Sequence, residues 1–220
     1  ADPNLGLVSG LARRIDAAGR ELGHEFCLRD PDEHRRYAPY AAPLITPAAM
    51  GRRELFAALP YRAEFPFAAD LDFQARMVER AHTVVVPEIL LRYRWHAGQT
   101  TQARAAAIEQ SRAVIQIITG RRQAGRAEDL AAVQAATAAP TAAGSWRRGA
   151  AVCLADRAPV FAAYQARRSF ALDRSPRGAW HALRLFRAAR RIAGAADRPQ
   201  VRRMFFSGPV RALGLQSAAS

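Results

Sequence analysis

The sequence lacks lysine, and all 33 of its basic residues are arginine. In an alanine-rich chain, this reflects the base composition of a genome more readily than a need for phosphate recognition, although arginine is the better residue for bidentate phosphate contacts. Two cysteines, Cys27 and Cys153, are too few for a disulfide framework or a zinc-binding cluster. We therefore expect two unpaired, buried thiols.

Long apolar runs are also missing. No basic start precedes an apolar core, which excludes a recognisable signal peptide. No charge-free window reaches the roughly 18 apolar residues that suggest a membrane span. Because half of the 220 residues are hydrophobic, the composition is that of a globular protein. We expect a cytoplasmic protein, with peripheral attachment to the inner face of the membrane as a variant of this prediction. Since the sequence begins at Ala1 without methionine, we also expect a piece of a longer protein.

Acidic residues are scarce in the second half of the chain. Residues 1–100 carry 13 arginines and 13 acids, whereas residues 101–220 carry 20 arginines and 6 acids. The whole formal excess of +14 therefore lies in the second half. Such asymmetry predicts two parts with different roles.

Local patterns support the same division. We predict strands at 5–15, 42–45, 84–86 and 89–95, a turn at 16–19, and a loop with one short helix at 22–40. We predict helices at 47–59 and from Asp70, separated by an aromatic loop at 61–68. After Thr101 the pattern is helical, with breaks near 140–145 and 174–178. The prediction is an α/β fold at residues 1–101, followed by a mainly α-helical, arginine-rich region at residues 102–220.

Four segments of the first part occur in the order and spacing of a known family. They are residues 4–20, 43–53, 65–73 and 87–101, the third containing Phe65-Pro-Phe-Ala-Ala-Asp-Leu-Asp-Phe73 and the last Arg94-Trp-His96. Together they resemble the later part of the catalytic domain of family 2 glycosyltransferases, which are inverting enzymes of the GT-A fold. The resemblance implies a partial GT-A-like layer on the acceptor side.

The resemblance also implies what the complete enzyme does. It would move a sugar from a nucleotide-sugar to an acceptor hydroxyl, as in cell-surface glycan synthesis, with a glycan or lipid-linked acceptor and a divalent metal, Mg or Mn. No Gly-rich phosphate loop precedes a helix. Neither Asp30-Pro-Asp32 nor Asp70-Leu-Asp72 follows a buried strand, so we interpret neither as the metal-binding motif. No metal cofactor is firmly predicted for this chain. We expect the nucleotide-binding half to be absent and the chain to be inactive alone.

Asp70 is the candidate catalytic residue. An inverting transfer needs a carboxylate that takes the proton of the acceptor hydroxyl, and the resemblance gives this role to the second acid of the family's Glu-Asp pair, here Asp70. The first acid is replaced by Ala69, which puts activity or acceptor choice in doubt. The alternative is that Asp70 only caps the helix.

Four further residues are candidate substrate-binding residues. Asp72 either supports Asp70 or is a solvated acid of the first helical turn. Arg92 and Arg94 alternate with aromatic residues on a strand and would stabilise a diphosphate leaving group. His96 would face the diphosphate and bind a metal or phosphate oxygen, or it stacks on Trp95. The remaining histidines have no metal-ligand spacing.

The helical pattern at residues 179–193 places arginines on one side and Leu185, Phe186 and Ile192 on the other. Such a helix would lie on an anionic membrane surface, or it packs by its apolar side and exposes its arginines to solvent. Nucleic acid is the other anionic partner to consider, but no recognisable module for it is present. The alternative function is therefore a basic helical nucleic-acid-binding or interaction protein without catalytic activity.

Overall fold

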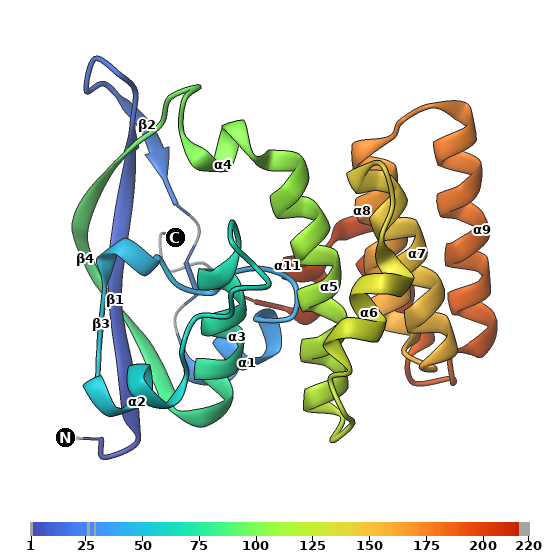
Figure 1. Ribbon diagram of the computed structural model, residues 1–220, viewed down its shortest axis with the longest axis horizontal. Coiled ribbons are helices and arrows are strands. Elements are labelled where there is room, and N and C mark those ends of the chain that lie inside the picture. The colour runs from blue at the N-terminus through green and yellow to red at the C-terminus, as the bar shows by residue number, and fades with distance from the viewer. Residues whose placement is uncertain (1, 26, 29, 216–220) are drawn as a thin grey trace. The chain divides into compact units, whose positions relative to one another are not determined.

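The computed structural model describes residues 2–25, 27–28 and 30–215 (Figure 1). Outside the described residues lie residue 1 of the predicted α/β region, residues 26 and 29 of the predicted loop at 22–40, and residues 216–220 of the predicted helical region. The chain divides into unit 1, Ala1–Ala105 with Leu215–Ser220, and unit 2, Ala106–Gly214. The division lies close to the one predicted after Thr101, and the mixed α/β class is confirmed.

Unit 1 contains a mixed sheet with α1, α2 and α3 on one of its faces (Figure 1). Its strands are β1 (Leu5–Ile15), β2 (Glu21–His24), β3 (Ala49–Gly51) and β4 (His82–Arg94). Its helices are α1 (Pro31–Tyr37), the 3-10 turn η1 (Thr46–Ala48), α2 (Arg53–Ala58), α3 (Ala69–Arg80) and α4 (Thr100–Ala103). The central strand is β1, which pairs in parallel with β4 and antiparallel with β3 near its start and β2 near its end.

The core of unit 1 lies between the sheet and α3. Phe73 and Met77, one helical turn apart, are buried with Leu7 and Leu11 of β1 and Val85 of β4. Each such side chain contributes about 1.5–3 kcal/mol when it is fully buried. This packing fixes α3, and with it Asp70, against the middle of the sheet.

The predicted strands at 84–86 and 89–95 are one continuous strand, β4. Pro87 lies inside it because the strand bulges there: Ser9 pairs with Val85, but Leu11 pairs with Ile89, so three residues of β4 lie opposite Gly10. A bulge leaves residues without ladder partners, and proline has no N–H to donate. Proline is therefore tolerated where the sequence suggested a strand end.

The predicted strand at 42–45 is wrong. The backbone N–H and C=O of Leu44 both bond to the side-chain amide of Gln74, at 3.0 and 3.1 Å, and the Ser9 hydroxyl donates to the Ile45 carbonyl. The backbone of residues 44–45 thus bonds to side chains and not to the backbone of a neighbouring strand.

The predicted helix at 47–59 is only partly correct. Ala49–Gly51 pairs with β1 as β3, and the α-helix is confined to Arg53–Ala58. The strand β2 was also not predicted, because all four of its residues are exposed and give no hydrophobic pattern.

Unit 2 is helical throughout its described residues. Its helices are α5 (Ala105–Gln123), which begins one residue before the boundary, α6 (Leu130–Thr137), α7 (Ala142–Ala155), α8 (Pro159–Leu172), α9 (Pro176–Ile192), α10 (Arg198–Ser207) and α11 (Pro209–Leu213). The hydroxyls of Thr141 and Ser175 cap α7 and α9. The predicted breaks near 140–145 and 174–178 are therefore only partly correct, because the helices begin at residues 142 and 176. Trp146 is fully buried, in edge contact with Tyr164.

Candidate active site

Asp70 lies in the first turn of α3 but does not cap the helix. The N-cap position is Ala68, and the helix begins at Ala69. The Asp70 side chain is exposed, and its Oδ1 accepts from the backbone N–H of Leu71 at 2.8 Å. The predicted N-cap role is therefore wrong by two residues, and Oδ2 is left open to solvent apart from one long contact.

That contact is with Thr46, whose hydroxyl lies 3.5 Å from Asp70 Oδ2. The same hydroxyl accepts from Gln74 Nε2 at 2.6 Å, so its proton is free to point at the carboxylate. Gln74 is buried one turn after Asp70 and is itself held by Leu44. Hydrogen bonds from Leu44 through Gln74 and Thr46 thus restrain the Asp70 carboxylate, which remains accessible to solvent.

The residues before Asp70 form the predicted aromatic loop, which leads directly into α3. Phe65 is buried, whereas Tyr61 and Phe67 are exposed. The guanidinium of Arg104, at the end of α4, lies 5.4 Å from the centre of the Phe67 ring, which is a cation–π distance. An exposed carboxylate, two aromatic rings and one arginine therefore belong to the same part of unit 1.

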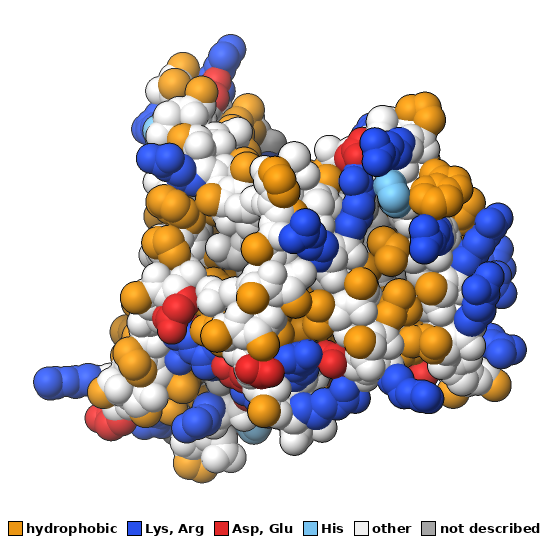
Figure 2. Space-filling view, turned by 45° about the vertical axis from the view of Figure 1, so that its right-hand side comes forward, with side chains coloured by type: hydrophobic (Ala, Val, Ile, Leu, Met, Phe, Trp, Pro, Cys, Tyr) orange, Lys and Arg blue, Asp and Glu red, His pale blue; other side chains and the backbone are white. Residues whose placement is uncertain are grey.

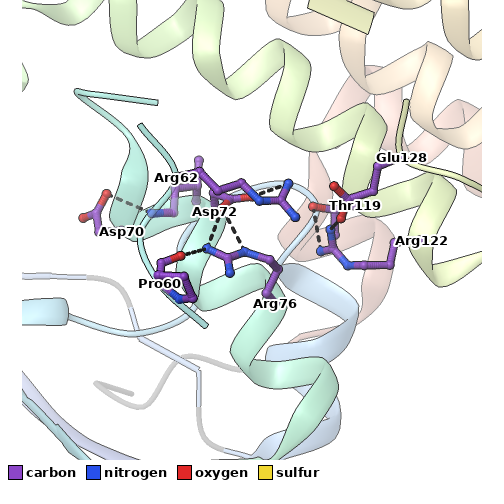
Figure 3. Close-up of polar contacts among 9 residues, drawn as sticks. Pro60, Arg62, Asp70, Asp72, Arg76, Thr119, Arg122 and Glu128 are labelled. Atoms are coloured by element: carbon purple, nitrogen blue, oxygen red, sulfur yellow. Dashed lines mark hydrogen bonds and ion pairs between the residues drawn. The ribbon is translucent and has the colours of Figure 1, made fainter. Parts of the chain in front are cut away.

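Asp72 is not a solvated acid. It is fully buried, and Arg76 holds it with contacts of 2.8–2.9 Å, while Arg62 lies 3.6 Å from its other oxygen (Figure 3). Arg76 also donates to the Pro60 carbonyl at 2.9 Å. Asp72 and Asp70 point away from each other in Figure 3. Through Arg76, Asp72 therefore anchors the start of the aromatic loop.

Arg92, Arg94 and His96 are exposed at the far end of β4. Arg94 donates to the carbonyls of Asp16 and Ala17 at 2.9 Å and so holds the turn after β1.

These three residues are not brought to Asp70. The Asp70 region adjoins Ser9 through the Ile45–Thr46 segment, whereas Arg94 pairs with Ile15. Ile15 lies six steps along the strand from Ser9, which is about 20 Å at roughly 3.3 Å per residue. The predicted stacking partner of His96, Trp95, contacts Tyr93 and Arg14 instead.

The acids of unit 1 do not fit the divalent metal that the resemblance implies. Within residues 2–25, 27–28 and 30–215, no group of three or more His, Cys, Asp or Glu is arranged to hold a metal ion. Asp30 instead caps α1, accepting from the Glu33 N–H at 2.8 Å. Asp70 and Asp72 point in different directions, so the two carboxylates do not face a common point.

The other histidines and the cysteines have structural positions. His34 is fully buried between the Thr83 hydroxyl, 2.6 Å from Nδ1, and the Leu28 carbonyl, 3.3 Å from Nε2. Cys27 and Cys153 are free and buried, as predicted, and burial raises the pKa of the Cys27 thiol to about 11. Neither is a reactive thiol.

In unit 2 the predicted helix at 179–193 is α9, and its apolar side is packed only in part, because Ile192 is exposed. Phe186 is buried and stacks on Phe205 at 4.4 Å. It is therefore part of the interior of unit 2 and is not free to insert into a membrane, while Trp180 and the arginines remain exposed. In the described part of the chain, no helix combines the length and apolar character needed to cross a bilayer.

Comparison with known proteins adds no family to these observations. No protein-family model matches the sequence. No curated protein and no solved structure matches it either. What the chain does must therefore be inferred from its own residues and their geometry.

Proposed function

We propose that unit 1 forms the acceptor side of an inverting glycosyltransferase, with Asp70 as the general base. The observation that carries the proposal is the exposed Asp70 carboxylate, restrained by Thr46 and Gln74 beside the aromatic loop. The resemblance to family 2 glycosyltransferases places the base at this residue, and the open Oδ2 gives an acceptor hydroxyl room to approach.

The chemistry asked of Asp70 is a single proton transfer. As the acceptor oxygen forms its bond to the anomeric carbon of the donor sugar, its proton passes to Asp70 Oδ2, and the bond to the nucleotide leaving group breaks with its electrons on the departing oxygen. General base catalysis of this kind contributes about 10²–10⁴-fold. Thr46 keeps the carboxylate oriented. This orientation favours catalysis, because a base that is already positioned loses less conformational freedom on reaching the transition state.

The acceptor would lie against the aromatic loop. Tyr61 and Phe67 of this loop are exposed, and aromatic side chains provide large, rigid apolar contact areas for a sugar ring. Ala69, which stands where the family has glutamate, supplies no side-chain hydrogen bond. Acceptor positioning in this protein therefore depends on the rings and on Arg104. Since the described acids do not fit a metal, we derive no step through one.

The proposal is tested in the protein expressed from its complete reading frame. Transfer of labelled sugar from a panel of nucleotide-sugars is measured for the unchanged protein and for Asp70→Asn. Loss of the base should lower kcat by about 10²–10⁴-fold, with nucleotide-sugar affinity unchanged. Glu64→Gln is the matched control, because Glu64 is an exposed acid of the same loop. Near-normal turnover by Asp70→Asn, or an equal loss in Glu64→Gln, would reject Asp70 as the base.

A further inference from the structure

Four arginines line one open hollow in unit 2. Arg187, Arg190 and Arg191 come from the last turns of α9, and Arg198 opens α10. The hollow is open to solvent and has a volume of about 370 Å³. Figure 2 shows basic side chains gathered along this side of the molecule.

Several other arginines of unit 2 are held by acids or backbone carbonyls. Arg121 binds Asp156 through two contacts of 2.7 and 3.1 Å, Arg122 binds Glu128, and Arg168 binds Glu109. Arg167 donates to the backbone carbonyls of Phe205 and Phe206.

By contrast, no hydrogen bond or ion pair to another described residue is found for the four arginines of the hollow. The nearest acid in sequence, Asp197, is a single exposed charge outside the lining. The hollow therefore keeps an uncompensated positive charge.

The guanidinium groups that line the hollow indicate which kind of ligand it could bind. A guanidinium donates through a planar fork that matches two oxygens of one phosphate. All the residues that line the hollow are arginines, and four such groups around one hollow can serve more than one phosphate. A compact anion with several phosphates would neutralise this charge.

We propose that the hollow formed by Arg187, Arg190, Arg191 and Arg198 binds a compact anion carrying two or more phosphate groups. This site lies within unit 2 and does not depend on the role of Asp70. The anion is either free in solution or the headgroup of a lipid with two phosphates, and both sources present the same oxygens to the guanidinium groups.

The test uses the whole chain and inorganic triphosphate as the probe. Binding is measured by titration calorimetry at about 0.15 M ionic strength, where distant charges are screened, with sulfate at matched ionic strength as the control anion. Arg190→Gln with Arg191→Gln removes two charges from the hollow. Arg174→Gln with Arg177→Gln removes two exposed charges near the other end of α9. Unchanged melting temperatures without ligand would show that both variants fold.

We expect the hollow variant to bind triphosphate at least tenfold more weakly and the control variant to stay within threefold of the unchanged protein. If vesicles of phosphatidylcholine with cardiolipin show this pattern and triphosphate does not bind, the site is confirmed with a lipid headgroup as its ligand. Equal weakening in both variants, sulfate binding as tight as triphosphate binding, or binding of duplex DNA alone would overturn the proposal.

Discussion

The two units use their charged side chains in different ways. In unit 1 the pair of Asp72 and Arg76 lies inside the protein, with Asp72 fully buried. In unit 2 the pair of Arg121 and Asp156 keeps 17% and 20% of its side chains exposed. A buried ion pair must satisfy its partners fully, because an unpaired buried charge costs several kcal/mol. A partly exposed pair is screened by solvent and contributes less.

The consequences of this difference are structural. The buried pair in unit 1 ties α3 to Pro60 and so fixes the loop that leads to Asp70. In unit 2 the few acids are used between helices: Glu109 of α5 binds Arg168 of α8, and Asp173 binds Arg147 of α7. The arginines of α9 and the start of α10 therefore lack acidic partners. Both units use ion pairs to hold elements together, and unit 2 has exposed arginines in addition.

The largest effect is expected on removing the buried acid of unit 1. Asp72→Ala leaves Arg76 buried without its partner and should lower the free energy of unfolding by about 3–5 kcal/mol. The measurement is the rate at which a thiol reagent reaches Cys27 in a Cys153→Ala background, because buried Cys27 reacts only when unit 1 opens.

Two controls sharpen this experiment. Asp70→Ala removes an exposed acid from the same helical turn and should cost less than about 1 kcal/mol. In the reverse background, Cys27→Ala, Asp72→Ala should leave the reaction of Cys153 unchanged. If Cys153 became as accessible as Cys27, the ion pair would not be specific to unit 1.

A smaller effect is expected at the acid of unit 2 with the most partners. Glu109 accepts from Arg168 at 2.6 Å, from Trp146 Nε1 at 3.1 Å and from Arg112 at 3.2 Å. Glu109→Gln keeps the shape but removes the charge, so we expect a loss of about 1–2 kcal/mol in denaturant unfolding. Asp197→Asn, at an exposed acid, should change stability by less than about 0.5 kcal/mol. Equal losses in both variants would contradict the special position of Glu109.

Much of the fold could be predicted because its strongest elements carry local signals. The apolar run of β1 and the apolar rhythm of α3 are visible in the sequence, and Thr141 and Ser175 mark helix starts. The failures have a common cause. Leu44 bonds to a side chain 30 residues away instead of to a strand, and a bulge in β4 that depends on β1 accommodates Pro87. Such long-range partners leave no local pattern.

The candidate site was predictable only in part. Asp70 was found through resemblance, and Gln74 could have been noted because it lies one turn later on the same helix face. Thr46 and Arg104 come from segments distant in sequence, and no motif marks them. The burial of Asp72 was missed because an acid in a first helical turn is usually solvated, and only the loop folding over it, with Arg76, makes burial tolerable.

The smallest effect concerns His34, which makes the stability of unit 1 depend on pH. Burial lowers the pKa of His34 below its usual 6.5, against the opposing influence of its hydrogen bonds to Leu28 and Thr83 and of the nearby Asp30 and Glu33. Below pH 6.5 the unfolded chain therefore takes up a proton that the folded chain refuses. Stability should fall as pH drops through 6.5 toward the folded-state pKa, by at most about 1.4 kcal/mol per pH unit.

This pH dependence is measured by labelling Cys27 after equilibration at pH 7 and at pH 5.5, with a brief pulse at one common pH so that thiol ionisation does not differ. His34→Gln keeps hydrogen-bonding groups in place of the ring and has no charge to gain. It should lower stability at pH 7 yet remove most of the change between the two pH values. Asp2, Asp16 and Asp173 do not interfere, because hydrogen bonds lower their pKa values below 3.8. A slope that survives in His34→Gln would assign the pH dependence to another group.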